Sequence, residues 1–231
     1  MYAVDTFGSN IAWKSASEIN SAMAGVYKHM TLAIVVSMLV SYLVGTTPEV
    51  LQFFFTGVLK WIVMFAPLVA VLGISYALSR DIPKEVAQLL LLGFAVLMGL
   101  SFSMIFAVYK MGSIFTAFMG AGVLFGTMTF YGYFTKRSLD SFGKFLFIGL
   151  IAIIIASIIN IFVGSSITQM VISALAILIF TGLTAYDTQK IREMIMYGDE
   201  KNVEVIGALT LYLDFINIFL SMLQLFGDKK E

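Results

Sequence analysis

The residue best placed to do chemistry is Asp214, because this carboxylate lies in the middle of the apolar stretch 207–226. In a helix that turns by about 100° per residue, the face around Asp214 also carries Thr210, Asn217 and Ser221. Apolar side chains cover the other faces, so this polar stripe is predicted to face protein or a water-filled cavity and not lipid. An ionisable group at membrane depth costs several kcal/mol, and by default it indicates an ion or proton pathway. The alternative is an aspartate that only forms hydrogen bonds between helices.

A second carboxylate, Asp187, ends the preceding apolar stretch, and Thr184 lies on the same helix face one turn earlier. Residues 170–186 and 205–226 are joined by a short connection, so the two helices are predicted to be antiparallel neighbours. At about 1.5 Å per residue, Asp214 lies about 14 Å inside the membrane boundary, whereas Asp187 lies close to it. The two carboxylates therefore meet only if the helices tilt or the last helix begins deeper in the membrane.

A close pair of carboxylates would combine two kinds of chemistry. In a low dielectric the two groups do not both ionise cheaply, so the pair is predicted to sense protons. When ionised, Asp187 and Asp214 offer hard oxygen ligands to Ca²⁺, and Asn217, Thr210 and waters could complete the roughly six to eight positions that calcium prefers. Two carboxylates bind calcium weakly, which suits a leak because tight sites do not conduct. The direction of the pH response stays open, because protonation also removes the ligand charge.

The composition places the chain in a membrane. It has 231 residues, of which 60% are hydrophobic and 12% charged, with a mean hydropathy of +0.96; soluble domains are about 25% charged. Fourteen basic side chains balance fourteen acidic ones, so there is no basic patch and nucleic acid is not expected as a partner. The absence of cysteine excludes disulfides, thiol catalysis and cysteine-ligated metals.

The chain divides into a polar segment 1–26, a membrane domain 27–227 and a short polar tail 228–231. The membrane domain is predicted to be all-α, because seven apolar stretches reach the roughly 20 residues that a spanning helix needs. These stretches are 27–44, 51–78, 86–109, 114–134, 145–163, 170–186 and 205–226.

The distribution of Lys and Arg predicts a cytoplasmic N-terminus, because cytoplasmic loops carry the excess of these residues. One side of the membrane receives ten of them: Lys14, Lys28, Arg80, Lys84, Lys136, Arg137, Lys144, Lys190, Arg192 and Lys201. The other side receives Lys110, Lys229 and Lys230.

Two spans contain residues that shape helices. Pro67 in the second span is predicted to bend it and to leave the carbonyl of Val63 without its usual partner. Lys60 in the same span is predicted to extend its ammonium group to the outer interface. Small residues recur in the third and fourth spans, where they are predicted to let helices pack closely; they are Gly99, Ser103, Gly120, Gly122 and Gly126.

Three segments resemble the Bax inhibitor-1 family. They are A-Y-D-T-Q-K-I at 185–191, A-L-T-L-Y-L-D-F-I-N-I-F at 208–219 and Y-G-Y-F-T-K-R-S-L-D-S-F-G-K-F-L at 131–146, the last of which is similar to bacterial members. The resemblance implies seven transmembrane helices, six of them surrounding a central seventh. It also implies a pH-sensitive calcium leak in the bacterial inner membrane, in which Asp187 and Asp214 form the buried pair and Arg80 latches onto Asp187.

Other functions fit the residues less well. An intramembrane aspartyl protease would need G-x-G-D around its aspartate, whereas Asp214 lies in L-Y-L-D, so no enzymatic activity is expected. A regulator that binds other membrane proteins, such as a membrane protease, would not need both aspartates and remains the alternative. A proton-coupled metabolite transporter would show inverted repeats. No phosphate-binding loop or metal-ligand spacing is present, so no cofactor is expected.

Overall fold

The computed structural model describes residues 14–80, 82–198 and 202–230. These residues form helices and no named strand, so the all-α prediction is confirmed. The helices are α1 (Ala16–Gly45), α2 (Pro48–Phe55), α3 (Leu59–Leu78), α4 (Lys84–Val108), α5 (Met111–Phe134), α6 (Asp140–Val163), α7 (Ser166–Tyr197) and α8 (Val203–Phe226). Within the described residues, seven of them, all except α2, are long and apolar enough to cross a membrane.

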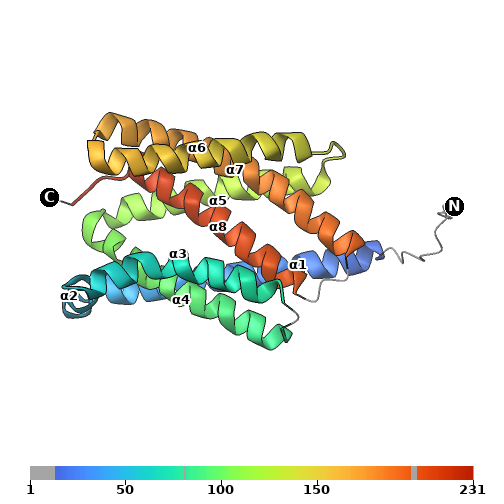
Figure 1. Ribbon diagram of the computed structural model, residues 1–231, viewed down its shortest axis with the longest axis horizontal. Coiled ribbons are helices and arrows are strands. Elements are labelled where there is room, and N and C mark those ends of the chain that lie inside the picture. The colour runs from blue at the N-terminus through green and yellow to red at the C-terminus, as the bar shows by residue number, and fades with distance from the viewer. Residues whose placement is uncertain (1–13, 81, 199–201, 231) are drawn as a thin grey trace.

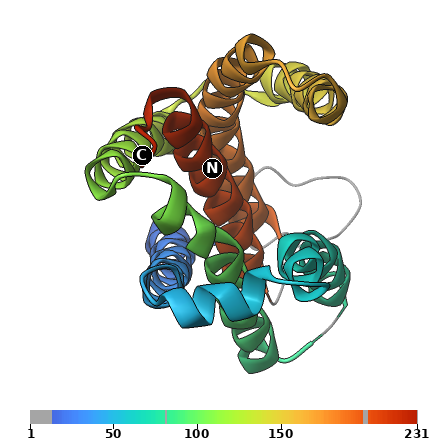
Figure 2. The ribbon, with the colours of Figure 1, turned by 90° about the vertical axis from the view of Figure 1, so that its left-hand side faces the viewer.

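Helix α8 is the central element. In its most apolar window 67% of the residues are buried, against at most 39% in any other spanning helix. Figure 1 shows α8 crossing between a group formed by α5, α6 and α7 and a group formed by α1, α3 and α4. The helices that pack on it are α1, α4, α5 and α7, while α3 packs mainly on α4, and α6 packs on α7. Since α3 and α6 lie on the outside (Figure 2), the predicted ring of six helices around the seventh is not confirmed.

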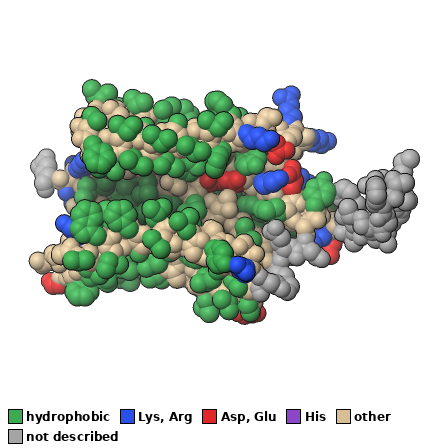
Figure 3. Space-filling view, viewed as in Figure 1, with side chains coloured by type: hydrophobic (Ala, Val, Ile, Leu, Met, Phe, Trp, Pro, Cys, Tyr) green, Lys and Arg blue, Asp and Glu red, His purple; other side chains and the backbone are tan. Residues whose placement is uncertain are grey.

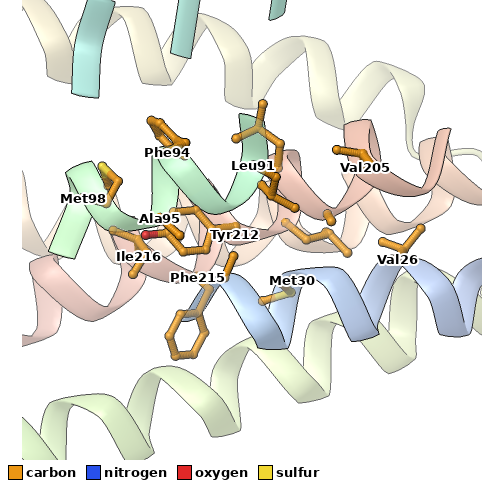
Figure 4. Packing of buried hydrophobic residues seen from close by; sticks show 14 of the residues in the cluster. Val26, Met30, Leu91, Phe94, Ala95, Met98, Val205, Tyr212, Phe215 and Ile216 are labelled. Atoms are coloured by element: carbon orange, nitrogen blue, oxygen red, sulfur yellow. The ribbon is translucent and has the colours of Figure 1, made fainter. Parts of the chain in front are cut away.

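The apolar side of α8 is embedded in the core. Tyr212 is fully buried, and its ring meets Phe94 of α4 edge-on with 5.9 Å between the centroids. Its hydroxyl group lies 2.6 Å from that of Ser37 on α1, so its polar end is satisfied. Figure 4 shows this residue among Leu91, Phe94 and Ala95. These contacts fix the rotation of α8, and so they decide which way its polar stripe points.

Helix α1 begins well before its predicted span at 27–44. Ser15 caps it, with a bond from the Glu18 amide to the Ser15 hydroxyl and another from the Ser15 amide to the Glu18 carboxylate. Ile19, Met23 and Val26 then bury one face at helical spacing. Residues 16–26, counted as part of a polar segment, are therefore helical.

The second predicted span, 51–78, is two helices. The chain breaks between α2 and α3 at Gly57, whose φ of +58° is a left-handed conformation that glycine adopts at little cost. Lys60 therefore lies in the first turn of α3 and not deep in a span, and its ammonium group sits 5.2 Å from the Trp61 ring centroid.

The carbonyl of Val63 is free of its usual partner, as predicted from Pro67. The carbonyl of Val63, which cannot receive a bond from the proline nitrogen, accepts a hydrogen bond from the hydroxyl group of Ser101 on α4. The bond joins α3 to the rest of the bundle at membrane depth, where an unpaired carbonyl would be costly.

The predicted close packing at small residues is found at some positions and not at others. A Cβ at Gly99 would lie 2.7 Å from the backbone carbonyl oxygen of Ser37, so Gly99 lets α4 approach α1 as predicted. At Gly120 a Cβ would meet the end of the Met222 side chain. The packing prediction is wrong for Gly122 and Gly126, because no atom lies within 4 Å of a Cβ built there. Both face outward from α5.

We expect Gly99→Ala to destabilise the protein by about 1–3 kcal/mol, because the new methyl group would collide with the backbone of α1. The matched control, Gly122→Ala, should be neutral or stabilising by up to about 1 kcal/mol, since alanine favours the helix and has open space. Thermal unfolding of both variants in detergent measures the difference. Equal melting temperatures would contradict the close approach of α1 and α4.

Candidate functional site

The two carboxylates lie at the same depth. Helix α7 continues for ten residues past Asp187 to Tyr197, and Asp214 lies eleven residues into α8, which starts at Val203. Each aspartate is therefore about 15 Å from the end where the two antiparallel helices are joined. The prediction that Asp187 lies at a helix end is wrong.

Charged residues caused that error, because they ended the apolar pattern without ending the helix. Lys190 and Glu193 form an ion pair of 3.6 Å one turn apart on α7. The guanidinium group of Arg192 lies 5.3 Å from the Tyr133 ring centroid on α5. These partners keep the last turns of α7 helical beyond the apolar stretch.

The side chains of Asp187 and Asp214 interact directly. The two carboxyl groups lie within interaction distance of each other. A hydrogen bond between two carboxyl groups requires one proton, so this arrangement suits a pair that shares a proton. Asp214 is only 4% exposed, and its buried Oδ2 atom has no hydrogen-bond partner among the described residues. The pair therefore has oxygen atoms that no other protein group occupies.

A cavity of about 1240 Å³ adjoins the pair. Its floor is formed by α7 and α8, and its sides by α3 and α6. Figure 3 shows this face, where a hollow runs between two bands of hydrophobic side chains. Asp and Glu side chains are visible part of the way along the hollow. Thr210, Asn217 and Ser221 line the cavity as predicted. Thr184 does not, because it is buried with its hydroxyl group on the carbonyl of Phe180.

The neutral side chains near the pair can supply further oxygen ligands. The amide nitrogen of Asn217 donates to the carbonyl of Leu213 at 2.8 Å, which leaves its Oδ1 atom as an acceptor. The hydroxyl group of Thr210 donates to the carbonyl of Ile206, so its oxygen can still accept. No cluster of three His, Asp or Glu side chains occurs in the described part of the chain. Any cation held here would thus be bound by two carboxylates and neutral oxygens.

A second polar cluster lies at the other end of the cavity and was missed in the sequence. Gln224 accepts hydrogen bonds from Gln169 at 2.9 Å and from Ser173 at 3.0 Å. Asn160 of α6 donates in turn to Gln169. Gln224 follows Ser221 by three residues, so the same helical spacing could have extended the stripe to it. The cavity is thus bounded by amide groups at one end and by the carboxyl pair toward the other.

The basic residue that lies beside the cavity is Lys144, and not Arg80, which was predicted to contact Asp187. Arg80 is exposed, and its guanidinium group donates to the hydroxyl group of Tyr76 and lies over that ring. It forms no ion pair with Asp187 among the described contacts, so the latch is not made in this conformation and stays a prediction. Lys144 of α6 does line the cavity, together with Tyr186 and Asp187. Sequence reasoning used Lys144 only to assign topology.

We expect the double variant Asp187→Cys, Asp214→Cys to be joined by a short bifunctional thiol reagent, because the two side chains touch. The chain has no other cysteine. Mass spectrometry of the digested protein would detect the α7–α8 link. In the control, Asp187→Cys with Gln224→Cys, the second thiol lies about 15 Å further along α8 and should not link. Equal yields in both variants would show that the aspartates are not at matched depth.

Comparison with known proteins identifies the family of the chain. The model of the family described as "Inhibitor of apoptosis-promoting Bax1" matches residues 19–231. The inner membrane protein YbhL of Escherichia coli K12 is 35% identical over 218 residues, which cover 92% of this chain and 93% of YbhL. An uncharacterized protein of Borreliella burgdorferi is 36% identical over 221 residues, or 92% of this chain and 94% of that protein. The seven apolar helices and the inner-membrane relative together support a multi-pass inner membrane protein. The resemblance seen in the sequence motifs is confirmed, and the chain belongs to the Bax inhibitor-1 family.

Proposed function

We propose that the protein is a pH-sensitive calcium leak channel of the inner membrane. The observation that carries the proposal is the direct contact between Asp187 and Asp214 beside a cavity that extends to the amide cluster around Gln224. A buried pair that served only to hold helices together would not need a cavity beside it. The chemistry of oxygen ligands at membrane depth favours a hard cation as cargo.

The composition of the site suits conduction better than storage. Two carboxylates supply the charge, and Asn217 and Thr210 supply neutral oxygens close by. Calcium sites of high affinity use more charged ligands in a rigid frame. With fewer charges, an ion can enter the site and also leave it, as conduction requires.

Protons enter the mechanism at the same pair. A shared proton occupies the oxygens that would bind calcium, so protonation changes the number of charged ligands. Protonation also removes the charge to which Arg80 would attach in a latched conformation. Both effects act through Asp187 and Asp214, and we therefore propose that this pair makes the flux depend on pH.

The basic residues support an orientation with the N-terminus in the cytoplasm. Lys14, Lys84 and Lys144 lie near the end of the molecule where α1 starts, whereas Lys110 and Lys230 lie beside the C-terminal tail. By the positive-inside rule the first group is cytoplasmic. The carboxyl pair then lies toward the cytoplasmic side of the cavity, and the amide cluster around Gln224 lies toward the opposite side.

We expect Asp214→Asn to reduce calcium flux into dye-loaded liposomes to the level of protein-free liposomes across pH 5 to 8, because one of two charged ligands is lost. Asp187→Asn should do the same. The matched control is Asp140→Asn, whose carboxylate is exposed at the start of α6 and does not line the cavity. It should keep the wild-type flux and its pH dependence.

An unchanged flux in folded Asp214→Asn would contradict the mechanism. A wild-type protein that gives no flux above empty liposomes would overturn the channel proposal itself. The alternative, a regulator that binds other membrane proteins, would then be the better account of this chain.

A further inference from the structure

A second cavity, of about 300 Å³, lies on the opposite side of α8 from the polar stripe. Its floor is formed by Phe215, Ile216 and Phe219 of α8, and its sides by α1, α4 and α5. Figure 4 shows the Phe215 ring pointing away from the buried cluster around Leu91 and Phe94. That ring meets Phe118 of α5 with 5.3 Å between centroids. The volume is at the lower end of the range of about 300–1,000 Å³ for ligand pockets.

The cavity opens toward lipid. Residues at its rim are strongly exposed although they belong to spanning helices: Leu39 by 53%, Tyr42 by 47% and Phe115 by 64%. The polar groups within it are few: Ser37 already donates to Ala33 and pairs with Tyr212, which leaves the hydroxyl groups of Ser41 and Tyr42. A cavity with so few polar groups holds water poorly. In a membrane, an opening of this kind admits an acyl chain.

A third cavity, of about 390 Å³, lies beside the second one and has a different character. The two share Phe106, Met111 and Ile114 in their linings. The third lies at the ends of α1 and α4, where a spanning helix meets the interface, and Lys230 lines it. Among the described residues that line the two cavities, Lys230 is the single charged one, and none is a carboxylate.

The C-terminal tail holds Lys230 in place. Its amide donates to the carbonyl of Val108 at 2.8 Å, and Lys110 donates in turn to the carbonyl of Asp228 at 2.9 Å. The Lys230 ammonium group donates to the carbonyl of Phe106 at 2.7 Å. An ammonium group has three donors, so two remain for another acceptor.

We propose that these two adjacent cavities, named here the lipid site, bind one anionic phospholipid. An acyl chain occupies the apolar cavity between α1 and α5, and the phosphate group accepts hydrogen bonds from Lys230. The occupant is a phospholipid and not a free fatty acid or a soluble phosphate, because the site joins an apolar cavity open to the bilayer with a cation at interface depth. The lipid would touch Phe215 and Phe219, which lie on the same helix as Asp214.

Photolabelling in liposomes tests the proposal without any assay of ion flux. The probes are phosphatidylglycerol and, for comparison, phosphatidylcholine, each with a diazirine in the acyl chain. We expect mass spectrometry to find adducts on the buried floor residues Phe215, Ile216 and Phe219, with stronger labelling by phosphatidylglycerol. Lys230→Gln should lower the phosphatidylglycerol adducts about fivefold. Lys229→Gln removes a neighbouring exposed charge that lines neither cavity and should leave them unchanged.

A second pair of variants tests the apolar part independently. Ser41→Phe places a ring in the cavity and should reduce labelling by both lipids, whereas Val123→Phe adds the same bulk outside it on α5. Adducts confined to outward-facing residues would overturn the lipid site. Labelling that is equal for the two lipids and insensitive to Lys230→Gln would overturn the assignment of the phosphate group.

Discussion

The contact between the carboxyl groups of Asp187 and Asp214 is the constraint to which the rest of the structure is fitted. A carboxylate at membrane depth needs a partner within the protein, because lipid provides none. Antiparallel helices α7 and α8 provide it by reaching about equal depths, which requires α7 to extend well past Asp187. The charged last turns of α7 make this length stable through Lys190 with Glu193 and Arg192 with Tyr133.

Contacts on the opposite face of α8 fix the rotation of this helix about its axis. Tyr212 contacts Phe94 of α4 and Ser37 of α1. Gly99 lets α4 pack closely against α1 on the same side of α8. Helices α1, α4 and α5 pack on the apolar faces of α8, and α7 packs beside its polar stripe. Because α3 and α6 stand further out, space remains over the stripe. The incomplete ring of helices is therefore what allows a cavity beside the carboxyl pair. A complete ring would bury the stripe in protein contacts.

The sequence predicts those features of the site and fold that depend only on neighbouring residues within one helix. The stripe of Thr210, Asp214, Asn217 and Ser221 follows from helical spacing alone, and the freed carbonyl of Val63 follows from Pro67. The errors arose where tertiary contacts decide. Hydropathy could not show that α7 continues through charged residues, that Thr184 turns away from the cavity, or that Gly122 and Gly126 face outward. The break at Gly57 was hidden because the residues on both sides of it are apolar.

The central claim is that ions cross the membrane through the cavity beside Asp214, and blocking this cavity tests it most directly. Because the chain has no cysteine, Ser221→Cys introduces a single thiol in the cavity lining. A cationic thiol reagent should stop calcium flux through this variant in liposomes. Ser75→Cys places the same thiol on an exposed position of α3 outside the cavity, and its flux should persist after labelling. Undiminished flux through fully labelled Ser221→Cys would contradict the account.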